Sequence, residues 1–153
     1  MPEKARRPTP GTVLAFDFGL QRIGVAVGER ETRSAHPLPG VKALSAPGRL
    51  TAIEKLIREW QPALLVVGRP LGEDGAPHET TRRAERFARQ LGGRFGVPVE
   101  LVDERYSSAE VESRMRAAYG ARKAVKLARG KALDSQAAQL LLQQYFDECE
   151  AHD

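Results

Sequence analysis

Three acidic residues in separate parts of the chain have the chemistry of a metal site. Asp17 closes a short apolar segment, Glu104 follows another, and Asp134 begins a third apolar pattern. Carboxylate oxygens are the ligands that Mg²⁺ and Mn²⁺ prefer in proteins. Two such ions, held about 4 Å apart, can activate a water molecule and stabilise the leaving oxygen in phosphodiester hydrolysis. If the fold brings these acids together, they predict a two-metal hydrolytic site for Mg²⁺ or Mn²⁺.

The elements that must position these acids begin with a hairpin. Residues 12–18 and 22–28 are short runs rich in β-forming side chains, joined by a tight connection, and they predict two antiparallel strands. Residues 32–41 contain Pro37 and Pro39. Because proline cannot donate to a strand ladder, we expect an irregular strand there, at the edge of the sheet.

Helices and strands alternate in the next part of the chain. Apolar residues recur at helical spacing from residue 47 until Pro62 ends the pattern, and again over residues 84–95. The apolar runs 63–67 and 97–102 predict strands, and the first is typical of a strand covered on both faces. Each of these strands is therefore reached through a helical connection.

The C-terminal part predicts two helices with a basic loop between them. Ser107 or Ser108 can cap a helix that runs to about Ala118, and a last helix runs from about Lys131 to Cys149. We expect the inner face of the last helix to carry Leu133, Ala137, Leu140, Leu141 and Tyr145.

This order of elements predicts an α/β domain around a five-stranded mixed sheet. A three-stranded antiparallel meander precedes two strand–helix crossovers, which make the first, fourth and fifth strands parallel neighbours. Ligands of such sheets gather at the carboxyl ends of the parallel strands, where Asp17 and Glu104 lie. Asp134 shares a helical face with Ala138 and Leu141. A carboxylate on an apolar face is costly unless it is paired or bound to a metal.

Each acid also has an ordinary structural explanation. Asp17 can begin the turn of the hairpin, and Glu104 can be a surface acid that pairs with Arg105. Asp134 can cap the last helix, because aspartate is a preferred residue at helix N-termini. The metal site therefore depends on the predicted topology.

The distribution of charge favours a nucleic-acid partner. The net charge is +4, and no acidic residue lies between Ser113 and Leu133. Such a block suits phosphate neutralisation, although a solvated helix face and loop would have the same composition. The residues of this block that we assign to nucleic-acid binding are Arg122, Lys123, Lys126, Arg129 and Lys131.

Length and composition limit the class of protein further. The 153 residues suit one compact domain, which we place at residues 12–149 behind a flexible basic tail of residues 1–11. No apolar run reaches the roughly 20 residues of a membrane span. We expect neither a secretory signal peptide nor a membrane partner, and we expect a cytoplasmic protein. With Cys149 as the one cysteine, no intramolecular disulfide can form.

Four motifs, in this order along the chain, resemble one known family. Residues 17–26 look like the opening motif of the YqgF/RuvX family of Holliday junction resolvases, and residues 67–71 resemble its glycine–proline loop. Residues 102–108 are similar to its acidic motif. Residues 133–138 match its final motif, in which an aspartate is followed by paired alanines. The resemblance covers roughly residues 11–147.

The resemblance implies an RNase H-like nuclease fold with Asp17, Glu104 and Asp134 as catalytic metal ligands. The family is also linked to maturation of the 5′ end of the 16S ribosomal RNA precursor. The resemblance by itself does not decide between RNA and a four-way DNA junction. We expect RNA, with the junction as the alternative, because a small domain with one basic loop suits a flexible strand. Arg69 lies where the family usually has an apolar residue, and Ser108 replaces a common threonine. We expect Arg69 to add positive charge near the site.

Further candidates and alternatives complete the sequence predictions. Arg22, Arg69 and Arg105 lie near the acids and are candidates for nucleic-acid binding. No exposed apolar stripe marks an interface, so we expect a monomer or a weak homodimer. The Asp-Phe-Gly sequence at residues 17–19 also resembles the phosphate loop of actin-like ATPases, which need two such domains. A non-catalytic nucleic-acid-binding module would use the basic block equally well.

Overall fold

Five strands form one mixed sheet in the computed structural model. They are β1 (Thr12–Asp17), β2 (Arg22–Glu29), β3 (Ser34–Lys42), β4 (Leu64–Arg69) and β5 (Val99–Asp103), in the order β3-β2-β1-β4-β5. β1 pairs antiparallel with β2 and parallel with β4, which pairs parallel with β5. The predicted meander and parallel strands are confirmed. The structure describes residues 11–19, 22–42, 45–70, 78–104 and 132–152.

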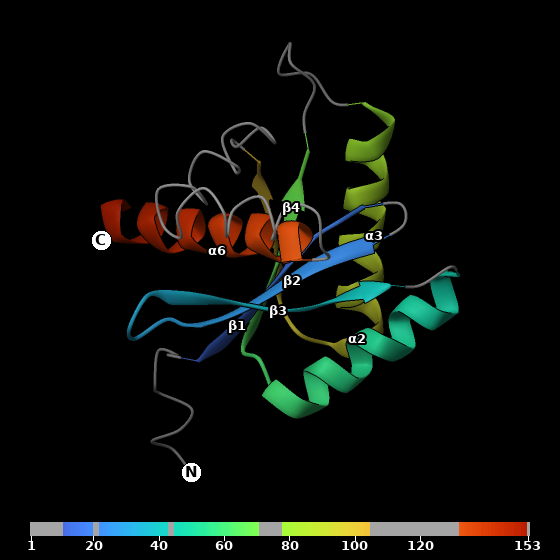
Figure 1. Ribbon diagram of the computed structural model, residues 1–153, viewed down its shortest axis with the longest axis horizontal. Helices are drawn as coiled ribbons and strands as arrows, with labels where there is room; N and C mark the ends of the chain where they lie inside the picture. Colours follow the sequence, from blue (N-terminus) through green and yellow to red (C-terminus); the bar gives the residue numbers. More distant parts are fainter. Residues whose placement is uncertain (1–10, 20–21, 43–44, 71–77, 105–131, 153) are drawn as a thin grey trace.

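Helices cover both faces of this sheet (Figure 1). In the described part of the chain, α2 (Ala46–Trp60) and α3 (Glu79–Phe95) pack on one face and α6 (Ala132–His152) packs on the other. None of these helices has the length and apolar character needed to cross a membrane. The helix predicted at residues 107–118 and the N-terminal tail lie outside the described residues.

Proline placement sets the edge of the sheet as predicted. β3 lies at the end of the strand order, and its register against β2 shifts between Ile23 and Val25. Pro37 and Pro39 both lie in this strand. An edge strand tolerates them because one side of its backbone has no ladder to maintain.

Local signals set both ends of α2. Ser45 Oγ accepts a hydrogen bond from the Gly48 amide at 3.2 Å, and Pro47 occupies the first turn, where no amide hydrogen is needed. Gln61 ends the helix in a left-handed conformation, with φ of 46°. Pro62 follows and prevents further helix, so the predicted end of this helix is confirmed.

Alternate side chains of β1 enter the two layers of the core. Leu14 and Phe16 pack in the cluster beneath α2 and α3, whereas Val13 and Ala15 pack in the cluster beneath α6. Because side chains alternate along a strand, Asp17 continues the row of Val13 and Ala15. The acid at the end of β1 thus belongs to the α6 face of the sheet.

α6 buries a partly different set of residues from the predicted one. Leu141 and Tyr145 are buried as predicted, but Ala137 and Leu140 are only half-buried, so the prediction was wrong there. The side chain of Leu133 lies outside the described residues. Ala138 is buried, as its place on the apolar face with Leu141 predicted, and the other buried residues of the helix are Ser135, Gln136, Leu142, Gln144 and Phe146.

Polar side chains turn inward on α6 because the sheet supplies their hydrogen-bonding partners. Ser135 Oγ donates to the Leu38 carbonyl of β3. Gln144 Nε2 donates to the Asp103 carbonyl of β5 at 3.1 Å. Burial of a polar group is tolerated when it is bonded in this way. The buried stripe therefore differs from the one that apolar spacing alone predicts.

Candidate active site at the ends of the parallel strands

The carboxyl ends of β1, β4 and β5 meet at one end of the sheet. Phe16 of β1 pairs with Val67 of β4, so Asp17 lies one residue beyond this pair. Glu104 directly follows β5, and its amide donates to the Arg69 carbonyl at the end of β4 at 3.0 Å. The prediction that Asp17 and Glu104 lie at the same end of the sheet is confirmed.

The Glu104 carboxylate lies directly over the backbone of Gly68. A Cβ atom on Gly68 would stand 2.6 Å from Glu104 Oε1 and 2.8 Å from Leu141 Cδ2. Both distances are shorter than a real Cβ contact, so the approach depends on glycine. Since Leu141 belongs to α6, the carboxylate lies on the α6 face of the sheet.

The start of α6 approaches the same end of the sheet. Ser135 Oγ accepts a hydrogen bond from the Val25 amide at 3.5 Å. Val25 pairs with Phe16, the residue before Asp17. Asp134 directly precedes Ser135 in α6, so the helix backbone brings Asp134 close to the end of β1.

The structure describes the side chains of Asp17 and Glu104, but only the backbone of Asp134. Asp134 is the third residue of α6 and therefore does not precede this helix as a cap would. Ala138 and Leu141, its neighbours one and two turns on, are buried as predicted. The Asp134 side chain itself lies outside the description, and no group of three metal-ligating side chains occurs among the residues described. Metal binding by Asp17, Glu104 and Asp134 thus stays a prediction.

The chemistry of the described donors fits a hard divalent cation. Asp17 and Glu104 offer carboxylate oxygens, the ligands that Mg²⁺ and Mn²⁺ prefer. Within the described part of the chain, no ion pair or side-chain hydrogen bond uses the Glu104 carboxylate. Glu104 therefore has oxygen atoms to offer on the α6 face, above Gly68.

Arg69 joins two carboxylates at the end of β4. Its Nη1 atom lies 3.0 Å from Glu85 Oε2 of α3, and its Nε atom lies 2.9 Å from Asp103 Oδ1 of β5. The Nε–H group is not aligned for a hydrogen bond, so the contact with Asp103 is an ion pair only. One guanidinium facing two carboxylates neutralises the positive charge that we expected Arg69 to add.

The residue after Asp17 is anchored on the opposite face of the sheet. The Phe18 ring lies 5.2 Å from the Phe87 ring of α3, and Phe87 makes an edge contact with Phe16. The Arg49 guanidinium of α2 lies 5.5 Å above the Phe18 ring. These contacts hold the backbone at the end of β1 and thereby limit the positions that Asp17 can take.

The structure describes two of the predicted nucleic-acid-binding residues. Arg22 begins β2 and is half-buried. Arg69 is the residue paired with two carboxylates, and its contact with nucleic acid stays a prediction. The predicted residues outside the described ranges are Arg105, Arg122, Lys123, Lys126, Arg129 and Lys131.

The sequence analysis missed several residues near this end of the sheet. Arg82, Arg86 and Arg89 are exposed on α3 at helical spacing, and a charge count along each helical face would have found them. Gly68 and Ser135 fall within the motifs at residues 67–71 and 133–138, but the sequence analysis predicted no role for either residue. Their contacts come from segments far away in the sequence.

Solved structures define the class of this fold. The chain is similar to RuvC of Thermus thermophilus, with a TM-score of 0.53 and 17% identity, over 92% of this chain and 96% of that one. It is also similar to the Fowlpox virus resolvase in complex with Holliday junction DNA, with a TM-score of 0.57 and 12% identity, over 90% and 98% of the two chains. The fold is RNase H-like, as the motifs predicted.

Sequence comparison then identifies the family. The model of the RuvX family, described as Holliday junction resolvase, matches residues 11–148. The "Putative pre-16S rRNA nuclease" of Burkholderia vietnamiensis is 49% identical over 142 residues, which cover 93% of each chain. The relative of the same name from Paraburkholderia phytofirmans is 52% identical over 136 residues, or 89% of this chain and 88% of that one. The chain belongs to the RuvX family, and the prediction of a nuclease is confirmed at the level of the family.

Proposed function

We propose that the protein is a divalent-metal-dependent nuclease whose active site lies at the carboxyl ends of β1 and β5. The observation that carries this proposal is the Glu104 carboxylate above Gly68, at the same end of the sheet as Asp17. Asp134 would complete the set of ligands. Family membership supports the proposal, since the family is described as Holliday junction resolvase and two relatives are named as nucleases.

Asp17, Glu104 and Asp134 would hold Mg²⁺ or Mn²⁺, with two ions in the site. When bound, the metal supplies an activated water molecule and neutralises charge on the leaving oxygen. The Glu104 carboxylate and Leu141 Cδ2 both lie above the backbone of Gly68, so Leu141 is the apolar neighbour of the proposed ligand on the α6 face. The contacts of Phe18 position the end of β1 and therefore the Asp17 backbone.

We propose RNA as the substrate, and in particular the 5′ end of the 16S ribosomal RNA precursor. The names of two relatives that are about half identical to this chain support this choice. The reaction would take place in the cytoplasm, and the protein would act as a monomer or a weak homodimer. The basic residues assigned in the sequence would bind phosphates beside the site.

Resolution of a four-way DNA junction is the second candidate function. The description of the family and the junction-bound Fowlpox virus resolvase favour it. Symmetric cleavage of a junction is most simply done by a two-fold dimer. A junction nuclease would therefore show paired nicks at symmetric positions, whereas a processing nuclease would cut one strand.

A cleavage assay separates these functions. The substrates are a labelled ribosomal RNA precursor fragment that spans the mature 5′ end and a mobile four-way DNA junction, each with Mg²⁺, with Mn²⁺ and with EDTA. We expect metal-dependent cleavage of the RNA to be faster than cleavage of the junction. Faster, paired nicking of the junction would establish the resolvase. Binding without cleavage under every metal condition would establish a binding module.

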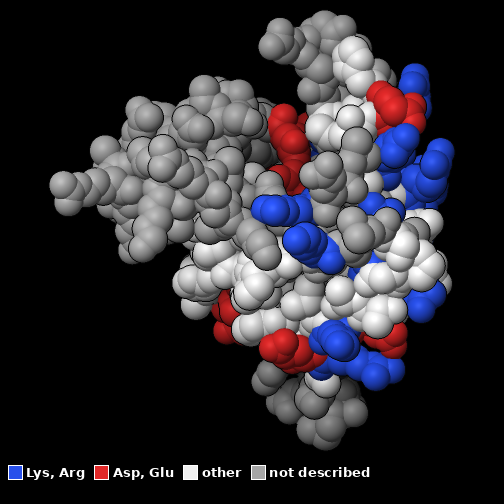
Figure 2. All heavy atoms as spheres, turned by 45° about the vertical axis from the view of Figure 1, so that its right-hand side comes forward, with Lys and Arg blue, Asp and Glu red and all other residues white. Residues whose placement is uncertain are grey.

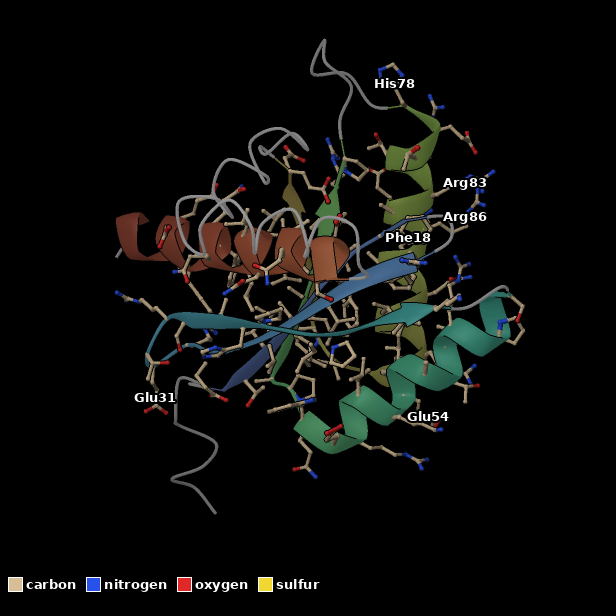
Figure 3. All side chains as sticks on the ribbon, viewed as in Figure 1. Phe18, Glu31, Glu54, His78, Arg83 and Arg86 are labelled. Atoms are coloured by element: carbon tan, nitrogen blue, oxygen red, sulfur yellow. The ribbon has the colours of Figure 1, made fainter. Side chains whose placement is uncertain are left out.

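Two variants control this assay. Asp17→Asn removes one proposed ligand and should lose the activity, which excludes a contaminating nuclease as its source. Glu31→Gln removes one exposed carboxylate in the turn that joins β2 and β3, at the opposite end of β2 from Arg22 (Figure 3). This control should cleave as the wild type does.

A further inference from the structure

α3 turns a row of arginines away from the sheet. Arg82, Arg86 and Arg89 are exposed, and their spacings of four and three residues place them on one face of the helix. On the other face Phe87 and Leu91 are buried in the core. We call the three exposed residues the α3 arginine row.

The acidic residues of α3 do not neutralise this row. Glu79 Oε1 lies 3.2 Å from Arg83 Nε, and Glu85 Oε2 lies 3.0 Å from Arg69 Nη1. These two are the acids of the helix sequence, and both are already paired. No ion pair within the described part of the chain includes the row. Three guanidinium groups on one exposed face therefore create a local excess of positive charge.

The first half of α3 is attached to the end of the sheet that carries the acids. Thr81, which is fully buried, donates its hydroxyl hydrogen to the Pro70 carbonyl just after β4. The contact between the rings of Phe18 and Phe87 ties the middle of α3 to the end of β1. Figure 3 shows Phe18 and Arg86 on the same side of the molecule. The first half of α3, with the start of the row, therefore lies at the same end of the sheet as the acids, on the opposite face.

Arg49 extends the positive surface from α3 to α2. Its guanidinium lies over the Phe18 ring, a geometry in which the ring face attracts the cation. Arg49 is thus held next to the residue that follows Asp17. Figure 2 turns the α3 side of the molecule forward and shows Lys and Arg side chains gathered there.

We propose that Arg49, Arg82, Arg86 and Arg89 bind the phosphate backbone of the substrate strand where it leaves the acidic end of the sheet. The inference rests on the proposed nuclease function and adds the path of the substrate across α3. The row spans about 10 Å along the helix. One strand of a duplex presents about three phosphates over this length. Arginine suits the role because its planar fork matches phosphate oxygens in two places at once.

Such contacts position the strand without reading its sequence, because phosphates carry no base information. Loss of the row should therefore weaken binding equally for all sequences. It should raise KM and leave kcat unchanged, since the row touches no reacting atom. These two features separate the row from the metal-binding acids, whose loss should lower kcat.

The test compares two triple variants that lose the same charge. One is Arg82→Gln with Arg86→Gln and Arg89→Gln. The control is Arg30→Gln with Lys55→Gln and Arg58→Gln, which changes exposed residues in the β2–β3 turn and the second half of α2. Affinity for a labelled single-stranded RNA, and for a duplex of the same sequence, is measured in EDTA over a range of KCl concentrations.

We expect the α3 variant to lower the slope of log affinity against log salt by roughly 2 to 3, at about 0.7 to 0.9 for each phosphate contact. The control should keep the wild-type slope. If the triple variant fails to fold, the single variants Arg82→Gln and Arg89→Gln should each lower the slope by about 0.7 to 0.9. Thermal unfolding of every variant monitors the fold.

An unchanged slope and KM in the α3 variants would overturn the inference. In that case the loss of cleavage in Asp17→Asn would still support the nuclease. An equal drop in slope for both triple variants would also overturn it, because the effect would then reflect net charge alone. A wild-type protein without salt-dependent binding to RNA or DNA would remove the proposed function together with the inference.

Discussion

The carboxylate of Glu104 occupies the space that a side chain on Gly68 would fill, since a Cβ atom there would stand 2.6 Å from Glu104 Oε1. Glu104 directly follows β5, and Gly68 of the neighbouring strand β4 pairs with Val102, two residues before Glu104 and on the same face of the sheet. The missing side chain at residue 68 thus lets an acid lie flat on the sheet beneath α6. The position of Glu104 therefore depends on the residue type at position 68.

Gly68→Ala should displace the Glu104 carboxylate and abolish cleavage while the fold survives. The added methyl group also meets Leu141 Cδ2 at 2.8 Å, but this atom is the end of a flexible side chain and can shift, so we expect only a small fall in stability. Cleavage rates and thermal unfolding measure the two effects. Gly93→Ala is the matched control, because a Cβ atom there meets nothing within 4 Å. A Gly68→Ala protein with wild-type kcat would show that Glu104 needs no such approach.

Asp17→Asn should lower kcat by at least about a hundredfold while RNA binding in EDTA and the folded structure persist. Glu104→Gln and Asp134→Asn should behave alike. Because metal ligands act as one unit, a double variant should lose little more than a single one. The comparison uses the rate constant for single-turnover cleavage of the RNA precursor fragment. Independent, multiplying losses would argue that the three residues do not share one site.

Metal binding should also be visible without any reaction. A ligand that binds only the native state stabilises it by about 2.7 kcal/mol at a concentration of 100 times its Kd. We expect Mg²⁺ or Mn²⁺ to raise the Tm of the wild type, and of Glu31→Gln to the same extent. Asp17→Asn and Glu104→Gln should show a much smaller rise. Equal shifts in all four proteins would place the metal elsewhere.

Arg69 should act as a positioning residue for Glu104. Arg69→Met removes both ion pairs, which join β4 to β5 and to α3. The Arg69 side chain is 31% exposed, so the two pairs together stabilise the fold by only about 1 kcal/mol. We expect Tm to fall slightly and kcat to fall markedly. We also expect the metal concentration that gives half-maximal activity to rise.

Arg69→Lys separates charge from geometry in this test. A lysine keeps one positive charge but cannot reach two carboxylates with a planar fork. We therefore expect it to restore Tm more fully than kcat. If Arg69→Met left both kcat and the metal dependence unchanged, the pairs with Glu85 and Asp103 would have a structural role only.

The order and direction of the strands could be predicted because prolines and strand–helix crossovers, which are visible in the sequence, determine them. Pro62 ends α2, and Pro37 and Pro39 confine β3 to the edge. Right-handed crossovers then leave one arrangement for β1, β4 and β5. For the same reason the strand-end positions of Asp17 and Glu104 could be predicted from the sequence.

Long-range register could not be predicted in the same way. The role of Gly68 depends on which residue of β5 lies beside it, and the inward turn of Gln144 depends on the Asp103 carbonyl. Neither partner is near in sequence. Apolar periodicity also fails on α6, because Ser135 and Gln144 are polar yet buried and bonded.

The late position of α6 in the chain has a consequence for synthesis. This helix contacts the Gly68 and Glu104 region through Leu141, and it bonds β3 and β5 through Ser135 and Gln144. Ribosomes release chains from the N-terminus onward, so the sheet emerges well before the helix that covers its α6 face. Until α6 follows, this face of the sheet, with Gly68 and the Glu104 carboxylate, therefore has no covering helix.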